Sequence, residues 1–378
     1  MEVCGGQTHA IVRSGLDRLL PAGLTLIHGP GCPVCVTPVA VLDGALQLAR
    51  RPEVILCSYG DMLRVPGSGN GVVVDETDRR GAGDDLLAAR AAGGDVRLLT
   101  SPLQALELAR RHPDRQVVFL AVGFETTAPA SALLARQALE LGLTNLSLLT
   151  AHVRVVPAMQ AILAAPDNRI QGFLAAGHVC AITGTEELAA LVRRWRVPVV
   201  VTGFSVTELL LGLRGLVEQL EAGRAELANA YASVVRPHGN PVARRLLAEV
   251  FEPVTLSWRG LGPIPAGGLA LRGAYAELEA SRRFQLPSSS QLATQRSAAG
   301  EGCPAAAGCG DAPPAATDGS GVDSSDADGA CLAAAVLQGR LRPPDCPSFG
   351  RRCRPDQPLG APMVSSEGAC AAYWQYRR

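Results

Sequence analysis

The sequence predicts an α/β fold built on parallel sheets. Between about residues 24 and 206, short runs of β-branched and apolar residues alternate with Ala- and Leu-rich stretches of helical spacing. Several runs end at glycine-bearing turns, which is typical of strands followed by a crossover helix. Hydrophobic residues make up 47% of the 378 residues and charged residues 19%, so the chain can bury sizeable cores.

Seven strands and at least two covering helices are expected in this region. The expected strands are residues 24–28, 53–57, 96–100, 116–122, 146–150, 172–176 and 198–202. Residues 41–50 and 101–111 carry apolar side chains at i, i+3 and i+4 and are expected to be helices. Because seven strands exceed one βαβαβ unit, we predict two similar α/β domains, 1–105 and 106–206. In such sheets the functional groups collect in the turns after the strand C-termini.

The remainder, residues 207–378, is predicted to form a smaller, cysteine-rich third domain. Leu-rich spacing over 207–234 predicts helix, and the prolines and glycines of 253–268 are expected to break regular structure. Residues 288–330 contain Ser, Ala, Gly, Asp and Pro with few large apolar residues. This stretch would bury too little surface to offset its chain entropy, so we predict a disordered insertion.

Charge and composition exclude several classes of function. Lys+Arg and Asp+Glu are both 35, so no global field attracts nucleic acid or anionic membranes. All the cations are arginine, which excludes a lysine Schiff base and a GxxxxGK[ST] phosphate loop. No apolar stretch is long enough to span a bilayer, and the N-terminus lacks signal-peptide features. We therefore expect a cytoplasmic protein without nucleic-acid or membrane partners.

Cysteine is the residue type that most directly suggests function. In a reducing compartment, cysteines indicate metal or redox work more often than structural disulfides. The chain has eleven, in two main groups: Cys4, Cys32, Cys35 and Cys57 near the N-terminus, Cys180 alone, and then Cys303, Cys309, Cys331, Cys346, Cys353 and Cys370. Two separate sites are suggested.

The first group contains a C-x-x-C pair, Cys32 and Cys35, in the turn after an expected strand. A helix N-terminus there would favour a thiolate, so the pair could cycle between dithiol and disulfide. Half of a zinc site and two buried small residues are the alternatives. Zinc would require another close cysteine pair in the same domain, and Cys4 and Cys57 are single.

Further candidate side chains lie in the opening segment and at two strand ends. Cys4 is followed by two glycines, Thr8 and His9, so a thiolate there could hold iron while Thr8 and His9 position ligands or carry protons. The alternative is a strand-end cysteine with a capping threonine. Glu125 and His178 each follow an expected strand, and their shared position at strand C-termini suggests one crevice, although either could be only a cap.

The second group lies in a segment rich in Pro and Gly, which needs a covalent or metal staple. Its four thiols could bind a 4Fe–4S cluster or structural zinc, and their spacing does not decide between them: Cys331, Cys346, Cys353 and Cys370. Cys303 and Cys309 lie inside the low-complexity stretch and are interpreted as incidental.

Four motifs together closely resemble the HypD family of nickel–iron hydrogenase maturation proteins, in the same order along nearly the whole chain. They are MEVCGG at 1–6, HGPGCPVC at 28–35, GFETT at 123–127 and MVSSEGAC at 363–370. Several long motifs in one order are far more specific than a single C-x-x-C. The fold implied by the resemblance is two similar α/β domains plus a third domain that bears a cluster.

The resemblance also implies a function. Such a chain would be a scaffold, with HypC as co-scaffold, on which iron receives two cyanides and one carbon monoxide before delivery to the hydrogenase large subunit. HypE, supplied by HypF, would donate the cyanide. Cys4 would be an iron ligand, with the Cys32 and Cys35 thiol pair beside it. A 4Fe–4S cluster on the C-terminal cysteines would exchange electrons with that pair.

The chain departs from the family pattern in three ways. Family members usually carry several tens of residues before the motif that starts here at Met1, which suggests a truncated or mis-started chain. Ala333 and Pro362 stand where the family commonly has cysteine, and the stretch before Cys331 is longer than expected. The competing interpretation is a stand-alone thiol–disulfide oxidoreductase with a structural zinc site.

Overall fold

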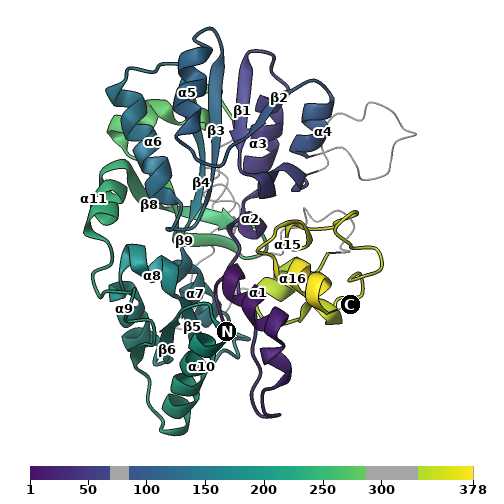
Figure 1. Cartoon of the computed structure of the whole chain (residues 1–378), viewed down its shortest axis with the longest axis vertical. Coiled ribbons are helices and arrows are strands. Elements are labelled where there is room, and N and C mark those ends of the chain that lie inside the picture. Colours follow the sequence, from purple (N-terminus) through teal and green to yellow (C-terminus); the bar gives the residue numbers. More distant parts are fainter. Residues whose placement is uncertain (69–84, 287–330, 378) are drawn as a thin grey trace, which may run out of the picture.

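The computed structural model describes residues 1–68, 85–286 and 331–377 as an α/β protein with two sheets (Figure 1). A six-stranded mixed sheet has the order β2-β1-β3-β4-β9-β8, and a three-stranded parallel sheet has the order β5-β6-β7. The strands are β1 Val54–Ser58, β2 Asp95–Leu98, β3 Gln116–Gly123, β4 Leu146–Val153, β5 Phe173–Ala176, β6 Val199–Thr202, β7 Leu227–Asn229, β8 Phe251–Trp258 and β9 Gly262–Leu271.

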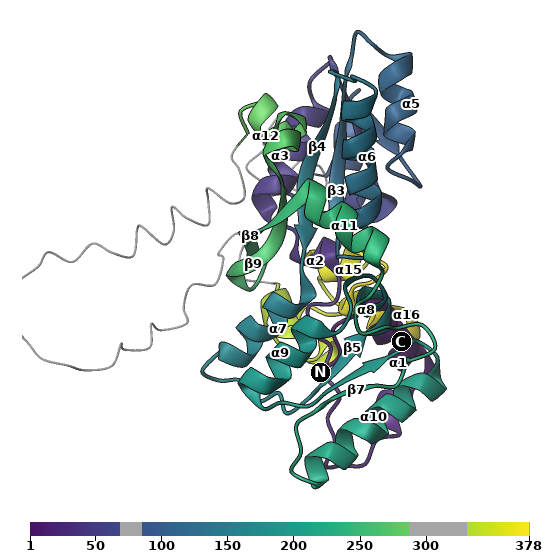
Figure 2. The ribbon, with the colours of Figure 1, turned by 90° about the vertical axis from the view of Figure 1, so that its left-hand side faces the viewer.

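Helices cover both faces of the larger sheet. Figure 2 shows α3 and α12 on one side of it and α5, α6 and α11 on the other. Strand β3 supplies both cores, because alternate side chains point to opposite faces: Phe119 packs towards α5 and α6, whereas Leu120 packs towards α3. The helices of this layer are α3 Val39–Ala49, α4 Leu86–Ala91, α5 Gln104–Arg111, α6 Ala128–Glu140, α11 Pro241–Val250 and α12 Ala280–Arg283.

The smaller sheet is covered in the same way. Leu174 of β5 and Val200 of β6 pack against α1 and α10, while Phe173 and Val199 belong to the core shared with α7 and α9. The short C-terminal helices α15 and α16 pack against α2 and α1, respectively (Figure 1), and Ala334 of α14 lies against Gly260. The bounds are α1 Gly5–Ser14, α2 Pro33–Val36, α7 Val155–Ala164, α8 Gly177–Thr183, α9 Glu186–Trp195, α10 Val206–Glu221, α14 Ala333–Leu337, α15 Ala361–Val364 and α16 Ala369–Tyr376.

Six of the seven expected strands are confirmed, as are the two covering helices. The strand expected at residues 24–28 is wrong: this run makes only a single bridge, between His28 and Glu2. The domain boundary near residue 105 stays a prediction. The strands on either side of it, β2 and β3, are both hydrogen-bonded to β1 in one sheet.

One expectation for the later part of the chain is confirmed only in part, and another is wrong. The helix expected over 207–234 ends at Glu221, because Gly223 turns the backbone into the left-handed region and β7 follows. Residues 253–268 form the β8–β9 hairpin instead of irregular structure. Gly260 and Gly262 supply the positive φ angles of its turn, and β8 tolerates Pro253 because it is an edge strand.

Two further expectations are limited by what the structure describes. The insertion expected at 288–330 lies outside the described residues, and the description resumes at Cys331. Across 1–68, 85–286 and 331–377, none of the helices combines the length and apolar character needed to cross a bilayer.

Candidate functional site

Cys4 immediately precedes α1, and its thiol faces a histidine at the start of α8. Cys4 Sγ lies 3.9 Å from His178 Nδ1 and 4.0 Å from Nε2. Burial raises the pKa of the Cys4 thiol to about 12, against the opposing effect of the Gln7 backbone N–H. Burial also lowers the pKa of His178, whose ring packs on Phe204. Both shifts favour the neutral thiol and the neutral imidazole near pH 7, so a metal that binds Cys4 would have to displace the thiol proton.

A buried carboxylate that the sequence reasoning missed organises the Cys4 loop. Glu2 Oε2 accepts the Cys4 backbone N–H at 2.8 Å, and its Oε1 accepts the Thr8 hydroxyl at 2.5 Å. His28 Nδ1 lies 2.7 Å from the same Oε1, and His28 Nε2 lies 3.2 Å from the Tyr373 hydroxyl in α16. Thr8 therefore contacts the loop both through Glu2 and directly, since its hydroxyl lies 3.3 Å from the Cys4 carbonyl. The only sequence signal for Glu2 is its place two residues before the cysteine.

Two glycines bring the Cys4 loop into contact with two other segments. The Gly5 N–H donates to the Gly31 carbonyl at 2.9 Å, and a Cβ on Gly31 would lie 2.5 Å from Cys4 Cα. A Cβ on Gly5 would lie 2.5 Å from the Glu367 side chain. Only glycine permits such close approach. The loop thus packs against both the turn that enters α2 and the segment that enters α16.

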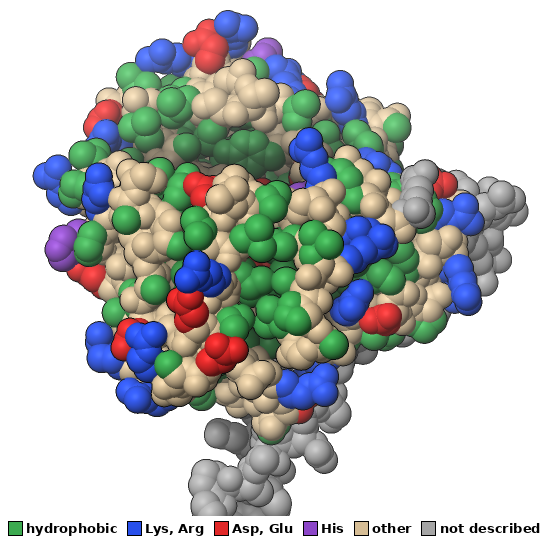
Figure 3. Space-filling model, turned by 60° about the horizontal axis from the view of Figure 1, so that its bottom comes forward, with side chains coloured by type: hydrophobic (Ala, Val, Ile, Leu, Met, Phe, Trp, Pro, Cys, Tyr) green, Lys and Arg blue, Asp and Glu red, His purple; other side chains and the backbone are tan. Residues whose placement is uncertain are grey.

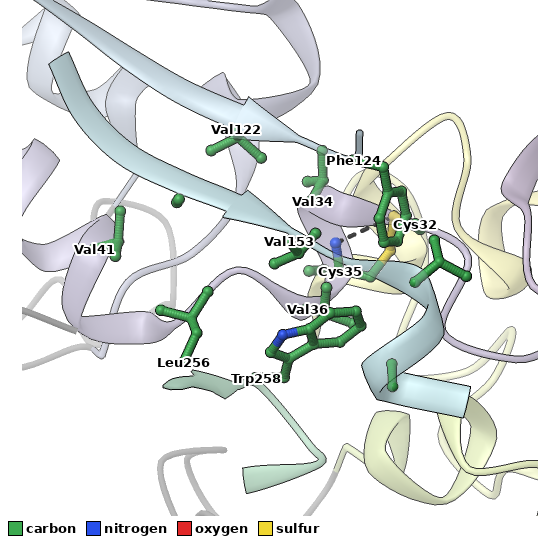
Figure 4. Close-up of a cluster of buried hydrophobic side chains, with 14 of the residues drawn as sticks. Cys32, Val34, Cys35, Val36, Val41, Val122, Phe124, Val153, Leu256 and Trp258 are labelled. Atoms are coloured by element: carbon green, nitrogen blue, oxygen red, sulfur yellow. Dashed lines mark hydrogen bonds between the residues drawn. A yellow bond between two sulfur atoms is a disulfide. The ribbon is translucent and has the colours of Figure 1, made fainter. Parts of the chain in front are cut away.

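The C-x-x-C pair is a disulfide in the structure. Cys32 and Cys35 have their Cα atoms 5.3 Å apart, and the Cys35 N–H donates to Cys32 Sγ at 3.1 Å. Figure 4 shows the pair among apolar side chains that include Phe124 and Trp258, whose ring centroids are 6.1 Å apart. Cys32 is 3% exposed and Cys35 1%. The surrounding side chains therefore shield the pair from water.

Glu125 lies at the C-terminal end of β3, as the sequence predicted, but does not join the Cys4–His178 pair. Its Oε1 accepts the Val155 N–H at 3.1 Å, and burial raises its pKa to about 7. Within the described part of the chain, its buried Oε2 has no hydrogen-bond partner, and no hydrogen bond connects it to Cys4 or His178. Its charge instead contributes to the raised pKa of the Cys180 thiol, after burial.

His9 also lies away from the Cys4 thiol. Its ring packs edge-on against Tyr376 at 5.6 Å, and burial lowers its pKa although the Ser366 backbone opposes this. Among the residues that the structure describes, His9 Nε2 has no hydrogen-bond partner. The His9 side chain therefore packs against the C-terminal segment, and none of its contacts within the described residues is with Cys4 or His178.

The four C-terminal cysteines lie around one cavity. The cysteines are Cys331, Cys346, Cys353 and Cys370. The other side chains that line the cavity are mostly apolar. Burial raises the pKa of the Cys370 thiol, with further contributions from the charges of Cys331, Cys353 and Cys346. Ala333 and Pro362 line the same cavity. Neither side chain adds a polar group to the cavity.

The donor set fits a multi-iron cluster better than a single ion. Zinc needs four donors converging at about 2.3 Å from one point. Within residues 1–68, 85–286 and 331–377, no three His, Cys, Asp or Glu side chains converge closely enough to hold one ion. Four thiols spread around an apolar cavity suit a 4Fe–4S cluster, whose irons each take one cysteine.

The family model and the similar proteins that match this chain all belong to one family. The family model HypD, described as the hydrogenase formation hypA family, matches residues 1–308 and 315–377. The hydrogenase maturation factor HypD of Azotobacter vinelandii is 45% identical over 384 residues, covering 100% of this chain and 89% of the relative. The proteins of the same name from Rhodobacter capsulatus and Escherichia coli K12 are 43% and 39% identical, covering 100% of this chain and 88% and 89% of the relatives.

Proposed function

Because the chain belongs to the HypD family of hydrogenase maturation factors, we propose that it is an assembly scaffold for the iron of nickel–iron hydrogenase. On this proposal the chain and a HypC co-scaffold hold an iron atom while it acquires two cyanides and one carbon monoxide. HypE, supplied by HypF, donates the cyanide, and the hydrogenase large subunit receives the product. The observation that carries the proposal is the contact of the Cys4 loop with both other thiol-bearing segments.

Cys4 is the proposed iron ligand. A thiolate is the soft, electron-donating ligand that iron with cyanide and carbon monoxide requires. Cys4 is 5% exposed, so water is largely excluded from its sulfur. The neutral His178 ring, 3.9 Å away at Nδ1, can accept the proton that the thiol loses when iron binds. The Glu2 carboxylate fixes the backbone of the loop meanwhile.

The C-terminal cysteines are the proposed ligands of a 4Fe–4S cluster. When bound, such a cluster would supply electrons one at a time. Reduction of the Cys32–Cys35 disulfide takes two electrons and two protons and gives two thiols. The apolar residues around both sulfur groups keep water away from this exchange. Since Gly5 packs against Glu367, the segment that carries Cys370 lies close to the Cys4 loop.

The alternative of a stand-alone thiol–disulfide oxidoreductase is less well supported. Such an enzyme needs an accessible attacking thiol. Here both cysteines of the pair are at most 3% exposed and packed among apolar side chains. A disulfide buried in this way suits an internal redox partner better than a protein substrate.

Metal analysis together with infrared spectroscopy tests the proposal. The full chain, purified anaerobically with its HypC partner, should contain iron and acid-labile sulfide and show metal-bound cyanide and carbonyl stretching bands. Zinc in place of iron and sulfide, with no such bands, would favour the oxidoreductase instead.

A further inference from the structure

An exposed patch of arginines adjoins the cavity of the C-terminal cysteines. We propose that this patch, made by Arg64, Arg351, Arg352 and Arg354, docks a small acidic one-electron carrier protein that reduces the cluster. The inference rests on the proposed cluster and adds to it the chemistry of the electron donor.

The patch is built by a compact turn around one proposed cluster ligand. Cys353 is flanked by Arg352 and Arg354, and all three arginines of the turn are exposed while Cys353 is buried. The Cys353 N–H donates to the Ser348 carbonyl at 2.9 Å, and Arg354 Nε donates to the Arg351 carbonyl at 2.9 Å. The turn therefore holds positive charges at the surface and a sulfur directly beneath them.

A fourth arginine comes from a distant part of the chain. The exposed Arg64, at the end of the 3-10 helix Gly60–Arg64, donates to the Pro355 carbonyl. The Leu359 N–H donates to Cys353 Sγ at 3.4 Å, so the turn closes back over the sulfur. Arg64 thus extends the patch across the junction between the larger sheet and the C-terminal segment.

These positive charges have no acidic partners in the part of the chain that the structure describes. Within the described residues, none of the four guanidinium groups forms an ion pair with a carboxylate, whereas Arg340 pairs with Asp167 and Arg377 with Asp17. Residues 331–377 contain six arginines and three acidic residues, although the whole chain has formal net charge zero. In Figure 3 basic side chains lie on both sides of the face in view, and on the right, the side where α15 and α16 lie in Figure 1, few acidic side chains accompany them. The C-terminal segment therefore carries a local excess of positive charge.

A local basic patch beside a redox centre selects an acidic partner. Electron-transfer complexes are small and transient, and their rates depend on charge steering of the encounter. Steering by complementary charges raises association rates by about 10- to 1,000-fold and weakens with salt. The partner would pass one electron to the oxidised cluster and dissociate oxidised, and two such encounters with two protons would reduce the Cys32–Cys35 disulfide.

Stopped-flow reduction of the reconstituted full chain tests the proposal. The probe is a negatively charged plant-type 2Fe–2S ferredoxin, and dithionite serves as a small reductant that needs no docking. The variant is Arg351→Glu with Arg352→Glu. The matched control is Arg110→Glu with Arg111→Glu, another adjacent exposed pair, at the end of α5 and far from the C-terminal segment (Figure 1).

We expect the patch variant to lower the second-order rate constant with ferredoxin by about tenfold or more at low ionic strength. The control variant should retain the rate, dithionite reduction should be unchanged in both, and the wild-type rate should fall as salt is added. An unchanged rate in the patch variant, or an equal loss in the control, overturns the docking proposal while leaving the cluster assignment intact. If the wild-type chain takes up no cluster, both the docking proposal and the cluster part of the proposed function fail.

Discussion

Replacing Gly31 by alanine perturbs the contact on which the proposed site depends. A Cβ at this position would meet the backbone of Cys4 and Val3, and both the Cys4 Cα and the Val3 carbonyl carbon would be only 2.5 Å away. Backbone atoms cannot rotate out of the way as a flexible side chain can. The Cys4 loop and the turn that enters α2 must therefore separate.

Two opposing effects determine how much the Gly31→Ala substitution changes the free energy of unfolding. Forcing an extra methyl group into a packed site costs about 1–3 kcal/mol. The substitution also reduces the entropy of the unfolded chain, which returns about 0.4–1 kcal/mol. We expect a net loss of about 1–2 kcal/mol in the free energy of unfolding, together with displacement of Cys4 from the thiol pair.

Gly215→Ala is a control within the same chain. No atom lies within 4 Å of a Cβ built on Gly215, which is in the interior of α10. This substitution should increase the free energy of unfolding by about 0.5–1 kcal/mol.

Urea unfolding, monitored by circular dichroism, gives the unfolding midpoints of both variants. The midpoints can be compared if the free energy of unfolding falls with urea concentration at the same slope in each protein. Infrared spectra of the HypC complex report whether the Gly31 variant still loads iron. A Gly31→Ala protein as stable as wild type, with undiminished cyanide and carbonyl bands, would show that the close contact is not required.

Three further predictions concern the other groups of the site. Cys353→Ala combined with Cys370→Ala should remove most of the iron and sulfide from the anaerobically reconstituted chain, whereas Cys57→Ala should keep them; full retention in the double variant would move the cluster elsewhere. Iodoacetamide added to the denatured, unreduced protein should label Cys57 and Cys180 but neither Cys32 nor Cys35 until a reductant is added, and immediate labelling of the pair would contradict the disulfide. Burial raises the pKa of Glu125 from 4.5 to about 7, so the folded state holds this proton more tightly and loses stability as pH rises through that window. Glu125→Gln should reduce the loss of unfolding free energy between about pH 5 and pH 8 by about 2–3 kcal/mol, and an identical pH dependence in both proteins would show that Glu125 is not the group responsible.

The sequence predicted the parallel strands well because each is a short apolar run closed by a turn, as β3 is by Gly123. It failed where tertiary pairing decides the outcome. The β8–β9 hairpin contains prolines and glycines that locally argue against strands, and its pairing to β4 is set by residues over a hundred positions away. The three-residue β7 is too short to give a periodic signal.

The candidate site was predictable to a similar extent. Cys4 and His178 could be assigned to one crevice because both lie beside strand ends. The Glu2–His28–Tyr373 chain of hydrogen bonds joins residues separated by 26 and 345 positions, so no local pattern indicates it. Glu125 was correctly placed at a strand end, yet within the described residues no hydrogen bond joins it to the thiol, because β3 belongs to the larger sheet whereas His178 follows β5 of the smaller sheet.

Infrared spectroscopy of a Cys4→Ala variant in complex with HypC tests the central claim most directly. Cys180→Ala is the matched control, since Cys180 is another buried thiol, on the same helix as His178. The iron assignment predicts that the cyanide and carbonyl bands disappear in Cys4→Ala and persist in Cys180→Ala, while the visible absorbance of the cluster stays the same in both. Unchanged bands in Cys4→Ala would contradict the assignment and move the iron to another ligand.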